Sequence, residues 1–425
     1  MKKMLSLAAM FAALSYASPA IAESNVNVYG ILDAAVGDLT HSLSVDPQLP
    51  GSVNPVTPVK KTVPGAAIGL FNGGFQSSRV GVRGSSDICD GTKVFFNLEE
   101  GINLPTGRVS NSAAALASNG GTATTSYTSG GSVDGQLFSR QANVGLSNVD
   151  WGSLAIGRNY TLFYDICQAY DPVQAASLFS PLAYSGTYGG GGGATEDLRV
   201  DNSLRYTNKI GSFNLGALYK FGGTAGEASA RSAYGVNAGY NEGNFGIQTA
   251  YEAFNDAISA SLSTAPNQVA ITNENTKAFI VAAKYKIGPA TLKIGYQQFT
   301  ISKPSDTFST TGSFYNYYGQ TVSGLTNFNG ANRTTHVLSG GGDCNFTDKF
   351  NLAAGIYDLS PQRSDDDVQK SANQIYLSLL ADYHITKAID TYAGVMYGSF
   401  SGSQYPTATY YQTNCLSAVG IRYKF

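Results

Sequence analysis

The residues best suited to chemistry in this sequence are charged side chains. Their spacing favours an electrostatic role, such as selection among ions, over catalysis. Histidine occurs three times, at His41, His336 and His384, and none stands at a metal-ligand spacing or beside a nucleophile motif. The sequence has no nucleotide-binding glycine motif and no calcium-loop pattern. We therefore predict no enzyme activity, no cofactor and no metal. What remains is a set of fixed charges, whose field could select among ions and dipolar solutes.

The basic members of this set lie on short segments in which polar and apolar residues alternate. Three arginines stand on the polar parity of their segments: Arg79, Arg83 and Arg205. Arg158 instead shares its parity with apolar neighbours, so it requires a bulge near Gly157 or a position beyond the apolar band. Arg140 raises the same conflict. The simpler alternative is that all of these arginines are ordinary solvated charges.

The acidic members come from one long connection, residues 161–198. They are Asp165, Asp171, Glu196 and Asp197. The Asp171-Pro172 pair and the small residues after it suit a short turn or a helical piece. Opposed charges on a wall and on such a connection could orient a dipolar solute between them. An external, solvated loop with incidental acids is the alternative.

The elements that must position these charges are strands, and the last segment of the chain shows the pattern best. On one parity it carries Tyr411, Thr413, Cys415, Ser417, Val419, Ile421, Tyr423 and Phe425. The other parity holds charged, small or amide-bearing residues, among them Arg422 and Lys424. Alternation with a period of two is typical of a strand with one apolar and one polar face.

Sixteen such segments are predicted along the chain, most of them nine to eleven residues long, which is enough to cross a bilayer at a tilt. They cover residues 26–40, 76–85, 93–101, 137–147, 153–160, 199–207, 213–221, 231–240, 244–254, 276–286, 290–300, 332–344, 350–359, 372–384, 389–400 and 411–425. Short turns alternate with long loops between them, as in an up-and-down transmembrane barrel. The predicted fold is therefore an all-β, 16-stranded antiparallel transmembrane β-barrel with short periplasmic turns and long extracellular loops.

The N-terminus and the composition agree with export. Residues 1–22 combine a basic start, an apolar run and an Ala-x-Ala site, which predicts a signal peptide, and residues 23–425 then form a single barrel domain. The 27 basic and 29 acidic residues are too evenly balanced to indicate nucleic-acid binding. Four cysteines remain after processing: Cys89, Cys167, Cys344 and Cys415. Their spacing permits disulfides but selects no pairing.

Several blocks of the sequence resemble the trimeric general porins of Gram-negative outer membranes. They are residues 24–35 (SNVNVYGILDAA), 78–87 (SRVGVRGSSD), 93–101 (KVFFNLEEG), 138–146 (FSRQANVGL), 154–158 (LAIGR), 199–206 (RVDNSLRY) and 419–425 (VGIRYKF). The resemblance runs the length of the mature chain, but its blocks are short and lie mainly in the first half and the last strand. Their order and spacing together match the family. The sequence departs from the family pattern at Cys89 and in the glycine run at residues 189–193.

This resemblance implies a homotrimer in the outer membrane, in contact with lipid and lipopolysaccharide, whose third loop, residues 161–198, folds into a pore for passive diffusion of small hydrophilic solutes and ions. The basic side of the pore constriction would be Arg79, Arg83, Arg158 and Arg205. The acidic side would be Asp165, Asp171, Glu196 and Asp197. Other pore-lining charges would be Asp33, Lys93 and Glu99. The terminal Phe425 would serve as the barrel-assembly signal.

Two other functions stay open on the sequence. A barrel of the same architecture could be selective for one class of solute, such as sugars or anions. A surface adhesin built from strands would need no pore at all.

Overall fold

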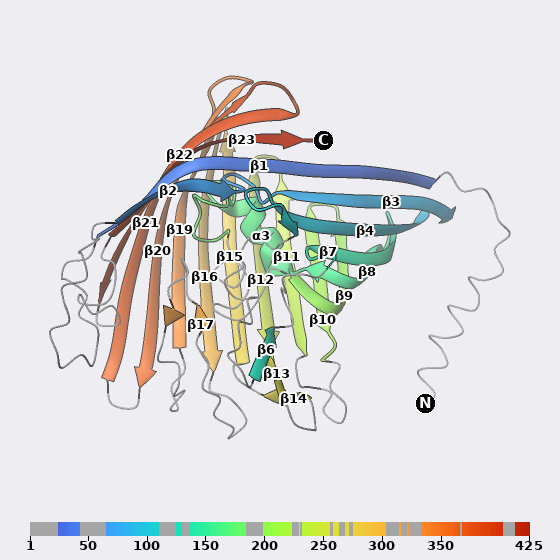
Figure 1. The fold of residues 1–425 in the computed structure, drawn as a ribbon. Coiled ribbons are helices and arrows are strands. Elements are labelled where there is room, and N and C mark those ends of the chain that lie inside the picture. The colour runs from blue at the N-terminus through green and yellow to red at the C-terminus, as the bar shows by residue number, and fades with distance from the viewer. Residues whose placement is uncertain are drawn as a thin grey trace.

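The computed structural model is a closed β-barrel (Figure 1). It describes residues 24–42, 65–109, 125–129, 137–183, 199–222, 229, 232–255, 258–262, 268–271, 275–302, 314–315, 321–322, 333–365, 368–402 and 413–425. The predicted signal peptide lies outside these residues. Within the described part of the chain, no helix combines the length and the apolar character needed to cross a membrane.

The wall is built from antiparallel strands that pair in sequence order. They are β1 (Ser24–Ser42), β2 (Gly65–Asn72), β3 (Arg79–Cys89), β4 (Thr92–Asn103), β7 (Gln141–Asn148), β8 (Gly152–Tyr160), β9 (Arg199–Ile210), β10 (Phe213–Lys220), β11 (Ala233–Glu242), β12 (Phe245–Phe254), β15 (Asn275–Ile287), β16 (Ala290–Ser302), β19 (Arg333–Asn345), β20 (Phe350–Asp365), β21 (Val368–His384), β22 (Ile389–Gly402) and β23 (Thr413–Lys424). The barrel closes where β1 pairs with β23 on one edge and with β2 and β3 on the other. Because β2 and β3 lie end to end along β1, the wall has the predicted sixteen strands.

The division of the second strand into β2 and β3 corrects a prediction. Residues 65–72 were expected to belong to a loop, but they pair with β1 over eight positions. The chain leaves the ladder at Gly73, whose φ of +73° suits glycine, and rejoins it at Arg79. The carboxylate of Asp33 replaces the lost ladder bonds, because it accepts the backbone N–H groups of Gly74, Phe75 and Gln76 at 2.6–3.1 Å.

The alternation read from the sequence is confirmed in the last strand. Val419 and Ile421 are 59% and 54% exposed on the outer face, whereas Leu416 and Arg422 are buried on the inner one. The same outward pattern of exposed aliphatic and aromatic side chains recurs around the barrel, including Val28 on β1, Ile294 on β16 and Ile356 on β20. An apolar surface of this extent is expected to face hydrocarbon rather than water.

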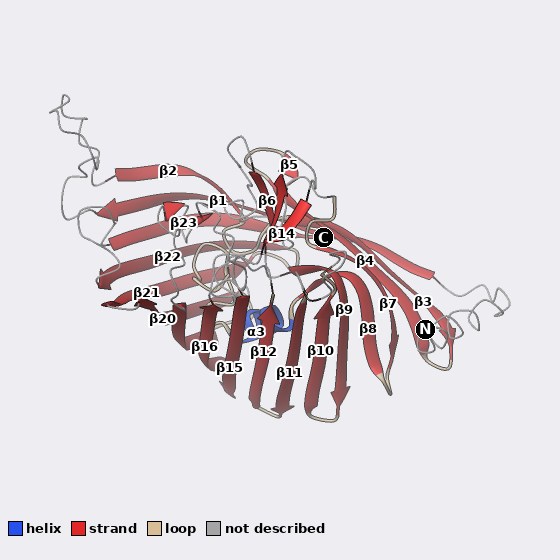
Figure 2. Cartoon of the chain, turned by 90° about the horizontal axis from the view of Figure 1, so that it is seen from below, coloured by secondary structure: helices blue, strands red, loops and turns tan. Residues whose placement is uncertain are grey.

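The inside of the barrel contains a helix, α3 (Leu162–Tyr170), and the turns that follow it to residue 183 (Figure 2). Apolar side chains of this segment, such as Phe163, Ile166 and Phe179, pack in one cluster with wall residues that include Phe299 and Tyr376. This packing fixes the segment against one side of the barrel and leaves the other side of the interior polar.

The connections follow the predicted rhythm with one exception. At one end of the barrel the turns are short, as at Gly243-Asn244 and Gly288-Pro289, and the C-terminus lies at this end (Figure 1). The opposite end carries the longer loops, which contain a small sheet of β6 (Thr125–Ser129), β13 (Ile258–Leu262) and β14 (Gln268–Ile271) and the short strands β5 (Arg108–Val109), β17 (Phe314–Tyr315) and β18 (Thr321–Val322). The connection from β20 to β21 was expected to be long, but both strands extend beyond their predicted ends and leave only residues 366–367 between them.

The four cysteines are free thiols, so the structure contains no disulfide among them. Cys167 is buried in α3, and burial raises the pKa of its thiol well above the usual value. Cys89, by contrast, is exposed beside a short turn.

Candidate functional site

The helix α3 presents two different faces, and its sequence explains why. Thr161 caps the N-terminus, since its hydroxyl accepts the N–H of Tyr164 at 3.2 Å. The apolar residues at helical spacing face the barrel wall, namely Leu162, Phe163, Ile166, Cys167 and Tyr170. The opposite face carries Tyr164, Asp165 and Gln168, which are less buried. This face is directed at the polar side of the interior.

The turns after α3 are organised by Asp171, which the sequence placed on the acidic side of a constriction. The residue is only 1% exposed. The carboxylate accepts the N–H groups of Val173 and Ala175 at 2.8 and 3.0 Å, together with the hydroxyls of Ser180 and Tyr357. Asp171 therefore differs from the expectation: its oxygens hold the loop in shape and present no surface to a solute.

A narrow space of about 30 Å³ lies between the polar face of α3 and the wall. Its charged lining consists of Arg79, Arg140 and Arg199, and Tyr164 and Gln168 face them from α3. Within the described residues, no carboxylate lines this space. Burial raises the pKa of Tyr164 to about 12, so its phenol stays neutral and contributes a dipole rather than a charge. The charged side chains that line the narrow space are thus all arginines.

One carboxylate behind these arginines keeps two of them in place. Glu99, on β4, accepts the Nε–H of Arg140 at 2.8 Å and lies 3.5 Å from Nε of Arg79. The hydroxyls of Tyr29 and Tyr160 donate to the same carboxylate at 2.9 and 2.8 Å. Glu99 is 5% exposed and Arg140 is 3% exposed, so this pair is buried, whereas the side chain of Arg79 keeps 20% exposure.

Aromatic rings support the remaining basic groups. The Arg199 guanidinium lies 5.1 Å from the centre of the Tyr160 ring, and that of Arg83 lies 4.9 Å from the Tyr29 ring. Such cation–π contacts hold a guanidinium without neutralising it. Arg83 lies closer to the short turns and does not line the narrow space.

The parity conflict of Arg158 is resolved by a bulge, which was one of the two alternatives that the sequence left open. The pairing of β8 with β9 shifts register between Gly157 and Asn159, and Gly157 has a φ of +131°. Arg158 is turned inward by this shift, where it donates to the carbonyl of Ser139 at 2.7 Å and pairs with Asp201. Arg158 is therefore engaged with the wall and does not line the narrow space.

Arg140 escapes the same conflict for a different reason. It precedes β7, so the parity of that strand does not apply to it. Sequence reasoning set Arg140 aside for its parity and did not single out Arg199, although Arg199 begins one of the blocks that resemble porins. Of the four predicted basic residues, only Arg79 lines the narrow space.

The other predicted charges have different surroundings. Asp165 pairs with Arg205, which joins α3 to β9. Asp33 is fully buried and, besides its backbone contacts, accepts the hydroxyl of Tyr392, so it braces the wall instead of lining a pore. Lys93 forms a solvent-exposed pair with Asp87 beside a short turn, with 3.4 Å between the charged atoms. Glu196 and Asp197 lie outside the described residues.

A second, wider space of about 770 Å³ lies near the short turns. Gln76 and Gln168 line both spaces, so the two adjoin. The charged lining of the wider space is mainly basic: it comprises Lys284, Lys286, Lys293, Arg422 and Lys424, with Asp343, Asp382 and His384. Lys284 and Lys293 are direct partners across β15 and β16, and Asp343 balances Lys293 at 3.0 Å. A solute leaving the narrow space would enter a basic chamber.

Known proteins resemble this chain in sequence and in fold. The model of the Gram-negative porin family matches residues 6–403. The chain is 28% identical over 303 residues to an outer membrane porin protein of Bordetella pertussis, an alignment that spans 71% of this chain and 60% of that protein. It is 26% identical over 301 residues to outer membrane porin protein 32 of Delftia acidovorans, spanning 70% of each. The solved structure of an anion-selective porin from Comamonas acidovorans has a TM-score of 0.61 at 18% identity, with 95% of this chain and all of that one covered.

Proposed function

Because the chain belongs to the Gram-negative porin family, we propose that it forms a water-filled channel through which small hydrophilic solutes and ions diffuse passively, with a preference for anions. Its place is the outer membrane, where the exposed apolar belt meets lipid. We infer the anion preference from the lining of the narrow space. It contains Arg79, Arg140 and Arg199 and, among the described residues, no carboxylate.

The two adjoining spaces support a route through the barrel. A solute would pass the narrow section between α3 and the arginines and then reach the wider chamber near the short turns, which face the periplasm in barrels of this kind. The polar lining offers no apolar pocket in which a single solute would be retained. This favours diffusion over a dedicated transport site, and family membership counts against the adhesin alternative.

The size of the electrostatic effect is large enough to measure. A unit charge about 4 Å from an ion changes its energy by about 1 kcal/mol in bulk water and by more where water is partly excluded. Since 1 kcal/mol corresponds to about a fivefold ratio, three arginines at one section can dominate ion choice. The relative from Comamonas acidovorans is called anion-selective, and an arginine-lined section would give this chain the same preference.

The test is the zero-current potential of the purified protein in a planar bilayer across a potassium chloride gradient. We expect the wild type to favour chloride, and Arg140→Gln or Arg199→Gln to lower the chloride-to-potassium permeability ratio by about fivefold each. Arg83→Gln is the matched control, because it removes the same charge from a residue outside the narrow space. A wild type that favours potassium, or an Arg83→Gln effect as large as the others, would overturn the proposal.

We further propose that three copies assemble, as in the family that the sequence resembles. The outer face of β1 and β2 carries closely spaced aliphatic side chains, including Val28, Val36, Ile68 and Leu70, which suit a contact between barrels. Light scattering of the detergent-solubilised protein, corrected for detergent, should give three times the mass of one chain. A monomeric mass would reject this assembly.

The role of Phe425 as a barrel-assembly signal stays a prediction. Its backbone exchanges two hydrogen bonds with Gly30, at 2.9 and 3.1 Å, and its ring stacks with that of Tyr423. These contacts close the seam between the two ends of the chain. Deleting Phe425 should therefore lower the yield of folded protein in the outer membrane, and an unchanged yield would remove this role.

A further inference from the structure

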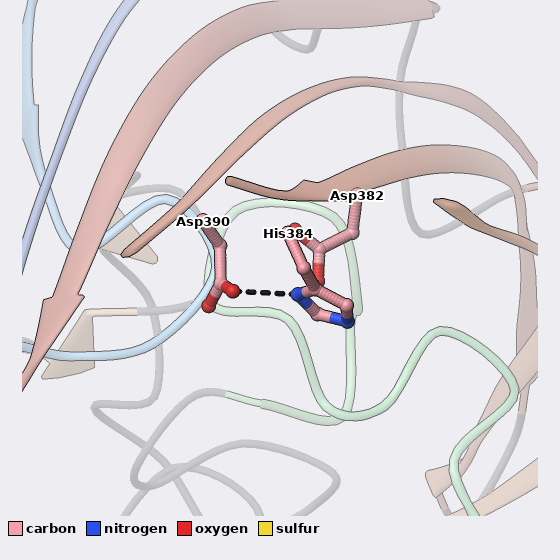
Figure 3. A group of neighbouring side chains, drawn as sticks. All are labelled: Asp382, His384 and Asp390. Carbon is pink, nitrogen blue, oxygen red and sulfur yellow. Dashed lines mark hydrogen bonds and ion pairs between the residues drawn. The ribbon is translucent and has the colours of Figure 1, made fainter. Parts of the chain in front are cut away.

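A cluster of three metal-ligand side chains lies on the inner wall near the short turns, and the channel function does not use it. His384 and Asp390 face each other across the hairpin of β21 and β22, and Asp382 precedes His384 by two residues on the same face. One ligand atom from each side chain falls within 4.8 Å of the other two. Figure 3 shows both carboxylates directed toward the imidazole.

The hydrogen bonds of the cluster divide the carboxylate oxygens into two sets. Oδ2 of Asp390 accepts Arg422 at 2.6 Å and Lys424 at 2.8 Å, and Oδ2 of Asp382 lies 3.4 Å from Arg422. Oδ1 of Asp390 contacts only Nδ1 of His384, at 2.6 Å. Oδ2 of Asp382 also lies 3.8 Å from Nδ1 of His384. The lysine and arginine therefore bind one oxygen of each carboxylate, and Oδ1 of each carboxylate has no lysine or arginine partner among the described residues.

Asp382 supplies an independent sign that a ligand is missing from this arrangement. Its residue is only 4% exposed, yet its Oδ1 is buried without any hydrogen-bond partner. A buried carboxylate oxygen without a partner is costly, because it has lost water and gained nothing in exchange. A cation bound between Asp382, His384 and Asp390 would satisfy it.

We propose that Asp382, His384 and Asp390 form a binding site for a divalent transition-metal ion of the zinc type. One imidazole nitrogen and two carboxylate oxygens suit Zn²⁺, which accepts three protein ligands and leaves the fourth position to water. Arg422 and Lys424 orient the carboxylates from behind, as the outer hydrogen-bond partners of metal ligands generally do. Arg422 is itself fixed, with its guanidinium 4.0 Å from the centre of the Phe75 ring.

The surroundings determine how such a site would behave. His384 and Asp382 line the chamber of about 770 Å³, so an ion can reach them from the water-filled interior. The positive charges of Arg422 and Lys424 oppose a dication, so binding is reversible rather than structural. A bound ion adds positive charge to a chamber that already contains Lys284 and Lys286, and it would strengthen attraction for anions there.

Isothermal titration calorimetry with zinc chloride tests the site on the full-length mature protein, folded in detergent and carrying no histidine tag. The wild type should bind one Zn²⁺ per chain. His384→Ala removes a proposed ligand and should weaken binding by more than the roughly 10–100-fold that loss of an outer hydrogen-bond partner costs, and Asp382→Asn should weaken it as well. His336→Ala is the matched control: it removes an imidazole that contacts Tyr296 on another part of the wall, and it should bind as the wild type does.

The outcomes separate the site from the channel function. Absence of saturable binding in the wild type, or unchanged affinity in both His384→Ala and Asp382→Asn, would overturn the proposal, whatever the ion preference of the channel. Equal loss in His336→Ala would mean that zinc binds imidazole in general and would also overturn it. Circular dichroism of each variant checks folding, and Asp382→Asn keeps the test decisive if His384→Ala does not fold.

Discussion

Two ion-pair clusters in the barrel wall are built with opposite polarity. Beside α3, the buried carboxylate of Glu99 holds Arg79 and Arg140, which line the narrow space. Near the short turns, Arg422 and Lys424 hold the carboxylates of Asp382 and Asp390 around His384. In the first cluster one acid holds two bases that line the narrow space, and in the second two bases hold two acids that surround a histidine.

The difference teaches that the orientation of an ion pair matters more for function than its presence. A residue that forms its ion pair from the wall side keeps its own charge away from the interior. It also fixes the position of the partner that lines the interior. Rigid presentation of this kind increases the selectivity of a site, because less ordering is needed when a solute arrives. Counting charges along the sequence cannot distinguish these two arrangements.

The largest expected effect comes from Glu99→Gln. It leaves Arg79 and Arg140 buried in the wall without their carboxylate, and breaking a buried pair from one side costs about 3–5 kcal/mol. Unfolding in denaturant should show this loss of stability. The chloride preference should persist or increase, because the arginines remain and a negative charge is gone.

A loss of stability with the chloride preference kept would show that Glu99 affects the stability of the barrel and not its ion selectivity. If Glu99→Gln abolished the chloride preference in protein that still folds, the arginines would have no selective role of their own. The comparison would then fail for the cluster beside α3.

Asp171→Ala is expected to have an effect comparable in size, but on the loop inside the barrel rather than on the wall. It removes an acceptor for two backbone N–H groups and two hydroxyls in the loop inside the barrel, and each buried donor left unpaired costs about 1–3 kcal/mol. The loop should lose its fixed position against the wall. Single-channel recordings should therefore show increased current noise, and quiet recordings would show that the apolar packing around Phe179 is sufficient.

The sequence predicted the wall of this barrel well because a strand of this kind depends on local alternation. Val419, Ile421 and Arg422 could be assigned to their faces from parity alone, and parity also pointed to Arg158 as an exception, with a bulge as one of two explanations. Residues 65–72 were missed because their pairing with β1 is supported by Asp33, a residue about forty positions away that accepts three backbone groups.

The candidate site was predictable only in part, because its geometry depends on contacts between distant residues. The sequence placed Asp171 among pore-facing acids, whereas backbone donors within its own turn bury it. Arg199 carried no signal that set it apart from other arginines. The spacing of Asp382 and His384 becomes meaningful only when the hairpin brings Asp390 opposite them.

The smallest effect is expected from Asp165→Asn, and it concerns selectivity rather than stability. Asp165 neutralises Arg205 at the edge of α3, and both side chains are partly exposed, so the pair contributes little to folding. Removing the acid releases one positive charge toward the interior. Because water and salt screen this position, the chloride-to-potassium ratio should rise by less than the roughly fivefold that 1 kcal/mol allows.

Asp87→Asn is the control for this change, since Asp87 also pairs with a cation, Lys93, but does so in solvent beside a short turn. It should leave the zero-current potential unchanged. It should change the free energy of unfolding by no more than about 0.5 kcal/mol. Equal shifts in the two variants would mean that the net charge of the barrel governs ion choice. A shift confined to Asp165→Asn would mean that the position of a charge relative to α3 governs it, as the comparison of the two clusters requires.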